Sequence, residues 1–229
     1  MKALVFDLDG TLIDSAADIH LACSKVLTDE NLPPVSLNQT RSFVGHGAAI
    51  LMSRLMAAVG LPDDKSLHQR LLDAFLTHYE TAVHLTTLYP GVQDALAELH
   101  HDGWLLGICT NKPLGPTKAV LAHFNLLETF RVVIGGDSLP QRKPDPQPLL
   151  AAITALGYPA TLFVGDSEVD AETATRAGID FALYTEGYRH APIDTLPHYA
   201  AFNEFAALPD LAAAWWRGKT ERCKPPKIC

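Results

Sequence analysis

Two carboxylates spaced two residues apart, Asp7 and Asp9, have the clearest chemical potential in this chain. They end an apolar segment, and in a strand over about residues 3–8 their side chains would project from the same face. Two like charges held that close favour a bound cation. Gly10 and Thr11 then let the backbone turn sharply. An Asp-Gly pair is also typical of a β-hairpin turn, but a helical segment follows, so no adjacent antiparallel strand is expected.

Polar residues also follow later segments that have strand character. The expected strands span about residues 104–110, 131–134, 161–164 and 179–184, and they alternate with expected helices at 92–101, 113–125, 146–156 and 168–177. This alternation is typical of a parallel sheet with crossover helices, whose ligand site lies at the carboxyl ends of the strands. The polar residues at these ends are Thr110, Asn111, Lys143 and Asp166, with Asp170 one helical turn further on. Each alone suits a helix cap or a solvated side chain, but their joint occurrence predicts one shared site.

A long helical segment separates Asp7 from this alternating pattern. Between about residues 16 and 85 the apolar side chains recur at helical spacing. We therefore expect a helical insert over 16–85 within an α/β core formed by residues 1–15 and 86–216. The basic, proline-interrupted tail at 217–229 is expected to be disordered.

The composition argues against several classes of function. The chain has 229 residues and a formal net charge of -8. Nucleic acid is not an expected partner, because phosphate-backbone binding needs clustered Lys and Arg. No apolar run approaches the roughly 20 residues of a membrane span, and the N-terminus lacks a signal-peptide core. We expect a cytoplasmic protein without a membrane partner, and the sequence leaves its oligomeric state open.

Taken together, these residues resemble the four motifs of the haloacid dehalogenase superfamily, in the same order. The matching stretches are Asp7-x-Asp9-Gly10-Thr11, Thr110-Asn111, Lys143-Pro144 and Gly165-Asp166-Ser167-x-x-Asp170. The resemblance covers the chain up to about residue 211. It implies a three-layer, Rossmann-like α/β core with a parallel sheet, and it implies that the insert is a small all-helical cap over the active site.

The resemblance also implies phosphoryl transfer through two carboxylates. Asp7 would be the nucleophile and would form an aspartyl-phosphate intermediate. Asp9 would protonate the leaving alcohol and then activate the water that hydrolyses the intermediate. Dehalogenases of this superfamily lack the second Asp, so dehalogenation is disfavoured.

A phosphate beside several carboxylates calls for a cation, because each pair of like charges at 4 Å costs roughly 4 kcal/mol at an effective dielectric of 20. An all-oxygen site suits Mg²⁺. By resemblance its ligands would be the side chains of Asp7 and Asp166 and the backbone carbonyl of Asp9, with Asp170 outside these direct ligands. The phosphoryl oxygens would be held by residues from the other strand ends: Lys143, Thr110 and Asn111.

The choice of substrate would depend on the insert. Its segment Val44-Gly45-His46-Gly47 resembles the Val-Gly-x-Gly stretch of bacterial phosphoglycolate phosphatases. In that interpretation the loop approaches the phosphate and His46 or Arg41 meets a small carboxylate, although an ordinary turn with a solvated His46 also fits. The candidate substrate-binding residues are Gly10, Arg41, Gly45, His46 and Gly47.

We expect a small phosphorylated metabolite as substrate, with 2-phosphoglycolate as the first candidate. A sugar-phosphate phosphatase, for example one acting on N-acetylmuramate 6-phosphate, and a β-phosphoglucomutase-like phosphomutase share the same motifs and remain the alternatives.

Overall fold

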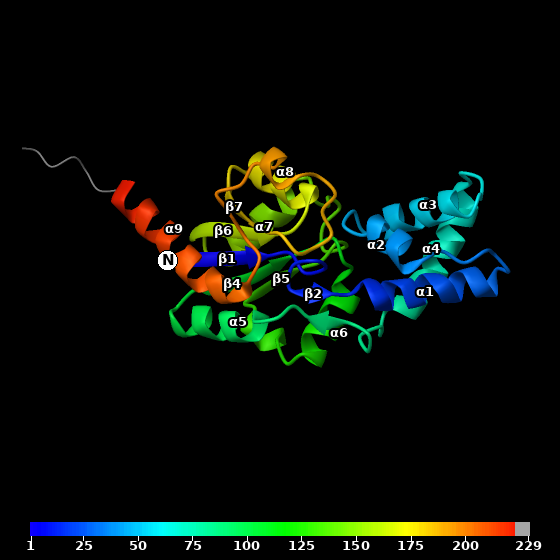
Figure 1. Ribbon diagram of the computed structural model, residues 1–229, viewed down its shortest axis with the longest axis horizontal. Helices are drawn as coiled ribbons and strands as arrows, with labels where there is room; N and C mark the ends of the chain where they lie inside the picture. The colour runs from blue at the N-terminus through cyan, green and yellow to red at the C-terminus, as the bar shows by residue number, and fades with distance from the viewer. Residues whose placement is uncertain (223–229) are drawn as a thin grey trace, which may run out of the picture.

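The computed structural model describes residues 1–222. Its main sheet has six strands in the order β5-β4-β1-β6-β7-β8, and every neighbouring pair is parallel (Figure 1). The strands are β1 (Lys2–Phe6), β4 (Leu105–Cys109), β5 (Val132–Ile134), β6 (Ala160–Gly165), β7 (Asp180–Tyr184) and β8 (Ala200–Phe202). The first strand has parallel partners on both sides, so it is not part of a hairpin, as the sequence predicts.

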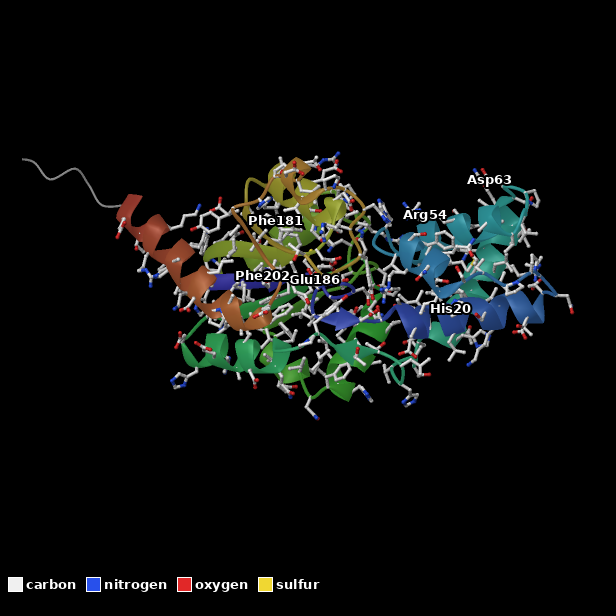
Figure 2. All side chains as sticks on the ribbon, viewed as in Figure 1. His20, Arg54, Asp63, Phe181, Glu186 and Phe202 are labelled. Carbon is white, nitrogen blue, oxygen red and sulfur yellow. The ribbon has the colours of Figure 1, made fainter. Side chains whose placement is uncertain are left out.

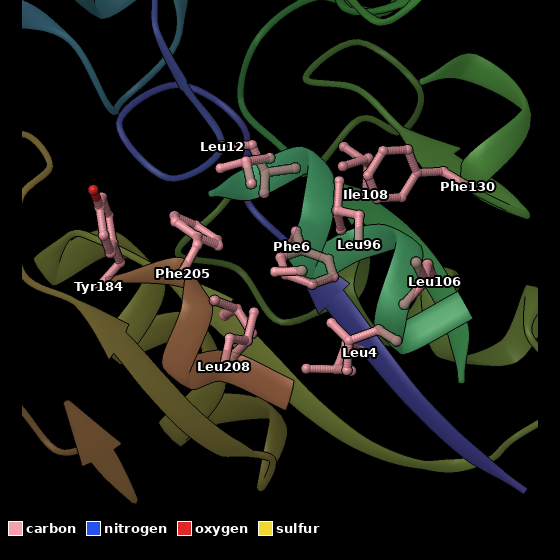
Figure 3. Close-up of a cluster of buried hydrophobic side chains, with 14 of the residues drawn as sticks. Leu4, Phe6, Leu12, Leu96, Leu106, Ile108, Phe130, Tyr184, Phe205 and Leu208 are labelled. Atoms are coloured by element: carbon pink, nitrogen blue, oxygen red, sulfur yellow. The ribbon is translucent and has the colours of Figure 1, made fainter. Parts of the chain in front are cut away.

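Helices cover both faces of this sheet and give the predicted three layers. One face carries α5 (Val92–His101), α6 (Leu114–His123) and α9 (Leu208–Arg222), and the other carries α7 (Gln147–Ala155) and α8 (Glu168–Ala177). Figure 3 shows the first of these interfaces, where Leu4 and Phe6 of β1 lie among side chains from the helices such as Leu96 and Leu208. Burial of each such side chain stabilises the fold by about 1.5–3 kcal/mol.

Four further helices lie beyond the carboxyl ends of the strands (Figure 1). They are α1 (Ala16–Asp29), α2 (Leu37–Phe43), α3 (Ala48–Ala58) and α4 (Lys65–Tyr79). Their apolar faces share a hydrophobic core of their own, with Met52, Leu55 and Phe75 among its most buried members. This separate core supports the proposed division into an α/β core and a helical cap over 16–85. Within the described residues, no helix combines the length and the apolar character needed to cross a membrane.

Several elements differ from the sequence-based expectations. The first strand ends at Phe6, and a short antiparallel pair, β2 (Ile13–Asp14) and β3 (Thr87–Leu88), joins the two chain segments that lead into and out of the cap. Two-residue strands are too short to leave a periodic pattern. The edge strand β8 was also not predicted. Three short 3₁₀ helices complete the chain: Leu127–Thr129, Ile193–Thr195 and Phe205–Ala207.

The last helix corrects the predicted start of the C-terminal tail. It continues to Arg222 instead of ending at residue 216. Trp215, which is 1% exposed, packs against the sheet, and its indole N–H donates to Asp180 at 2.6 Å. This anchoring holds the helix in place through the residues that the sequence assigned to the tail. The rest of the predicted tail, residues 223–229, lies outside the described residues.

Candidate active site

The carboxyl ends of β1, β4 and β6 meet because β1 lies between the other two strands. Asp7 follows β1 directly, and its backbone N–H donates to the carbonyl of Val164 at 2.8 Å, which extends the ladder with β6. Thr110 and Asn111 follow β4, and Asp166 follows β6. The chain leaves β1 toward one side of the sheet and later returns to the other. This is the topological switch point at which open α/β sheets bind ligands.

Three carboxylates converge at this point. One ligand atom from each of Asp7, Asp166 and Asp170 lies within 4.8 Å of the others, and all three side chains are buried. Asp166 is held from two directions, because the Thr11 hydroxyl donates to one oxygen at 2.7 Å and the backbone N–H of Tyr188 donates to the other at 2.7 Å. The sequence predicted this convergence, and the structure supplies the contacts that fix its geometry.

Gly10 lies directly against this cluster. Its φ is +90°, and a Cβ atom built on it would approach Asp166 Oδ2 to 2.5 Å. Only glycine allows the loop after Asp7 to pass so close to Asp166 without displacing it. The sequence treated Gly10 as a candidate substrate-binding residue, and the structure gives it this packing position.

Asp170 occupies the first turn of α8, where the helix dipole favours a carboxylate. Its Oδ2 accepts hydrogen bonds from the Ser167 hydroxyl at 2.6 Å and from the Ser167 backbone N–H at 3.1 Å. Its Oδ1 accepts from Lys143 Nζ at 2.7 Å. Both oxygens therefore have partners from the protein, which supports a role for Asp170 in holding Lys143 instead of binding a metal directly.

Lys143 is the buried cation of the cluster, with Asp7 Oδ1 at 2.8 Å on its other side. Burial disfavours its charge, but Asp170 and Asp7 outweigh that effect and raise the pKa of Lys143. Burial also raises the pKa of Asp7 to about 6, against the attraction of Lys143 and with added repulsion from Asp170. The pKa of Asp166 is raised as well, by burial first and then by Asp170 and Asp7. The positive charge of Lys143 therefore does not neutralise the three carboxylates of the cluster.

The residues present fit a hard divalent cation. Asp7 Oδ1 is buried, and its contact within the described residues is the ion pair with Lys143 at 2.8 Å. A buried carboxylate oxygen without a hydrogen bond is costly unless another ligand satisfies it. Oxygen donors in a cluster with excess negative charge are typical of Mg²⁺ sites. The side chains of Asp7 and Asp166 are placed to provide such donors.

Asp9 lies outside this cluster and has different partners. Its Oδ1 accepts from the Ser15 hydroxyl at 2.6 Å and from Lys112 Nζ at 3.2 Å. Lys112 in turn donates to the hydroxyl of Tyr79, the last residue of α4 in the cap. The sequence interpretation missed Lys112 and Tyr79 as site residues. The sequence did contain a signal for Lys112, which directly follows Thr110 and Asn111. Residues that follow a buried parallel strand lie at the ligand-binding edge of the sheet.

Asn111 has partners that the sequence did not predict. Its side-chain N–H groups donate to the carbonyl of Lys143 at 2.9 Å and to the carbonyl of Gly45, in the cap, at 3.0 Å. Its side-chain oxygen accepts from the Lys143 backbone N–H at 3.0 Å. In this structure the Asn111 side chain therefore positions Lys143 and joins the cap loop to the core, and its contact with a phosphoryl oxygen stays a prediction. Thr110 and Asn111 both line the adjoining pocket, and the expected contact of Thr110 with a phosphoryl oxygen stays a prediction.

Two pockets open from Asp7 and Asp9 between core and cap. The first, here called the lysine pocket, is lined by Thr110, Asn111, Lys112 and Tyr79 together with apolar cap residues. The second, here called the arginine pocket, is lined by His46, Arg54, Glu168 and His190. Gly45 borders both pockets and Gly47 borders the first. The glycine loop therefore approaches Asp7 and Asp9, as the sequence predicted.

The two cap residues expected to meet a substrate carboxylate have different positions. His46 borders the arginine pocket, where burial and then Arg54 lower its pKa. Arg54, on cap helix α3 (Figure 2), was not singled out in the sequence. Arg41 borders neither pocket. Its guanidinium pairs with Asp14 at 2.7 Å, and lies over the ring of Tyr188. The structure thus places Arg41 at the junction between core and cap.

Comparisons with known proteins show the family of this chain. Residues 4–184 match the family described as haloacid dehalogenase-like hydrolase. A phosphoglycolate phosphatase from Cereibacter sphaeroides is 49% identical over 212 residues, which is 92% of this chain and 97% of the relative. One from Rhodospirillum rubrum is 41% identical and covers 91% of this chain and 90% of its own length.

Solved structures show the same fold. A crystal structure from Haemophilus somnus, described as a predicted phosphoglycolate phosphatase, matches with a TM-score of 0.86 and 31% identity. The match covers 92% of this chain and 97% of that one. The likeness therefore includes the cap helices as well as the sheet.

Proposed function

The chain belongs to the haloacid dehalogenase-like hydrolase family, and from this we propose that it is a Mg²⁺-dependent phosphomonoesterase that acts on 2-phosphoglycolate. The observation that carries the proposed reaction is the state of Asp7. Its carboxylate is buried at the edge of both pockets, has an oxygen without a hydrogen bond, and has Lys143 at 2.8 Å. A carboxylate nucleophile needs a nearby positive charge that offsets its repulsion from the phosphate.

In this proposal Asp7 attacks the phosphorus and the alcohol leaves, so that an aspartyl-phosphate forms. Lys143, held by Asp170, stabilises the negative charge of Asp7 and of the phosphoryl oxygens throughout. The side chains of Asp7 and Asp166 and the carbonyl of Asp9 would hold Mg²⁺. The bound ion would supply positive charge that lowers the repulsion between carboxylate and phosphate.

Asp9 is suited to move the proton in both half-reactions. It borders both pockets with Asp7, yet its side chain lies outside the acidic cluster. It would donate a proton to the leaving oxygen and then accept one from the water that hydrolyses the intermediate. The Ser15 hydroxyl and Lys112 fix its orientation.

The substrate assignment rests on the relatives named phosphoglycolate phosphatase, which share up to half of their residues with this chain over nearly its whole length. The pockets fit a small substrate, since cap side chains such as Ile19, Leu51 and Phe75 limit the space beside Asp7. The partner is accordingly a small phosphorylated metabolite.

A comparison of kcat/KM over a panel of phosphometabolites, measured by phosphate release with Mg²⁺ present, tests the proposal. The panel contains 2-phosphoglycolate, N-acetylmuramate 6-phosphate and β-glucose 1-phosphate. We expect 2-phosphoglycolate to rank first, with stoichiometric phosphate release. A higher value for a sugar phosphate would contradict the substrate assignment, and formation of an isomer without phosphate release would contradict hydrolysis.

A further inference from the structure

Lys112 is a buried lysine whose contacts the proposed reaction does not fully use. Its side chain is 2% exposed and borders the lysine pocket beside Asp9. Lysine is almost never fully buried unless its charge is paired. Asp9, at 3.2 Å, supplies a pair, but a substrate in the pocket would lie against the same ammonium group. Among the described residues that line this pocket, Lys112 is the one with a positive charge.

The hydrogen-bond donors of Lys112 and of its neighbour Tyr79 are only partly used. An ammonium group carries three hydrogens, and in the described part of the chain Lys112 directs them to Asp9 and to the Tyr79 hydroxyl oxygen. Because Tyr79 accepts this bond through its oxygen, its own hydrogen is left for another acceptor. Burial, and then the nearby Asp9, raise the pKa of Tyr79, so this hydrogen is retained. Lys112 and Tyr79 thus offer a further donor each.

The position of this pair relative to Asp9 matches a substrate with a carboxylate near the leaving oxygen. Asp9 would protonate the leaving oxygen, and Lys112 Nζ lies 3.2 Å from Asp9. In a 2-hydroxy acid phosphate the carboxyl carbon is two bonds from that oxygen. A carboxylate so close to the leaving oxygen can reach a cation in contact with Asp9. The apolar cap side chains around the pocket exclude water and strengthen such a charge pair.

The arginine pocket is a weaker place for this carboxylate. Arg54 already donates to the carbonyls of Ser42 and Phe43 and contacts His46 Nδ1 at 3.3 Å. Glu168 borders the same pocket and would repel a second carboxylate. In this pocket Arg54 therefore acts mainly to shape the glycine loop of the cap.

We infer that Lys112, with the hydroxyl of Tyr79, binds a carboxylate on the leaving group and so selects phosphorylated 2-hydroxy acids over phosphate monoesters whose leaving group is uncharged. This inference rests on the proposed function and names the residues that give it specificity. Tyr79 belongs to the cap and Lys112 to the core, so the carboxylate site is complete only when cap and core are together.

The test compares kcat/KM for 2-phosphoglycolate and for ethyl phosphate, an analogue of similar size whose leaving group has no carboxylate, in the wild type and in Lys112→Met. Both values are expected to fall, because Lys112 also orients Asp9. The ratio of the two is expected to fall on the order of 30-fold or more, since truncating one partner of a buried charge pair has at least that effect. Lys118→Met, at an exposed lysine on α6, the helix that follows Lys112, is the control and should leave the ratio unchanged.

Two further variants keep the test informative if Lys112→Met does not fold. Lys112→Arg retains the charge and should retain most of the preference, while Tyr79→Phe removes one donor and should lower the ratio by a smaller factor. An unchanged ratio in Lys112→Met, or a ratio that collapses in Arg54→Met instead, would overturn the inference. Failure of the proposed function would differ, because the wild type itself would then release no phosphate from 2-phosphoglycolate.

Discussion

Replacing the proposed nucleophile by its amide, Asp7→Asn, should abolish turnover and at the same time stabilise the metal-free protein. The pKa of Asp7 is raised from 3.8 to about 6, chiefly by burial. Each unit corresponds to 1.36 kcal/mol, so the charged form costs the folded state about 3 kcal/mol. That net value already contains the attraction of Lys143, because the same contact contributes to the shift. For a chain of this length, 3 kcal/mol raises Tm by about 6–12 °C.

The stability difference between Asp7→Asn and the wild type should depend on pH. Above about pH 6 Asp7 is charged in both folded and unfolded chains, and the destabilisation is complete. Below pH 3.8 it is protonated in both, and the destabilisation disappears. The advantage of Asp7→Asn should therefore be largest at neutral pH and should shrink as the pH falls from 6 to 4.

Thermal unfolding in EDTA, followed by circular dichroism at pH 7.5 and at pH 4.5, measures both effects. Asp63→Asn removes a carboxylate from the exposed loop between α3 and α4 (Figure 2) and should change stability by less than about 0.5 kcal/mol. A Tm for Asp7→Asn at or below that of the wild type at pH 7.5 would refute the prediction that the charged Asp7 carboxylate destabilises the folded protein. Phosphate release that persists in Asp7→Asn would refute its role.

Two other predictions concern the surroundings of Asp7. Gly10→Ala places a Cβ 2.5 Å from Asp166 Oδ2, at a residue whose φ is +90°. We expect this variant to lose about 2 kcal/mol or more of folding stability and to lose activity. Gly103→Ala is the control, because Gly103 also has a positive φ but has open space where the Cβ would lie. Urea unfolding of the pair separates contact from backbone strain, and equal losses would contradict the contact with Asp166. Adding Mg²⁺ at about 100 times its Kd should raise Tm by about 5–11 °C at pH 7.5. The shift should be smaller at pH 5, where protons compete for Asp7 and Asp166, and a larger shift at pH 5 would contradict their role as ligands.

The convergence of Asp7, Lys143, Asp166 and Asp170 was predictable from the sequence because it follows from topology. In a parallel sheet with crossover helices, the residues after successive strands share one edge, whatever their separation along the chain. The three-layer core was predictable for the same reason, since long buried strands and amphipathic helices leave strong patterns. The elements that the sequence missed, β2, β3 and β8, are two or three residues long.

The roles that sequence reasoning missed or misplaced depend on contacts between cap and core. Buried Lys112 contacts both the hydroxyl and the ring of Tyr79, which lies at the end of α4 in the cap. Arg41 was expected at the substrate, but Asp14 lies near enough to pair with it at the junction. The side chain of Asn111 donates to the backbone carbonyls of Lys143 and Gly45, two contacts that no local pattern in the sequence indicates. Such contacts depend on how two separate hydrophobic cores dock, and no local pattern encodes this.

These contacts also show that cap residues hold side chains of the candidate active site in place. Asp9 accepts from Ser15, at the start of the first cap helix, and from Lys112, which the cap residue Tyr79 holds. Asn111 connects Lys143 to the cap loop at Gly45. Asp9, the proposed proton-transfer group, and Lys143, beside the proposed nucleophile Asp7, are therefore both positioned partly by the cap. A cap displaced from the core would loosen the same side chains that perform the chemistry, so reaction and substrate selection would depend on one docked arrangement. This coupling gives a physical reason why hydrolysis of an aspartyl-phosphate would be confined to the state in which the correct leaving group has been bound.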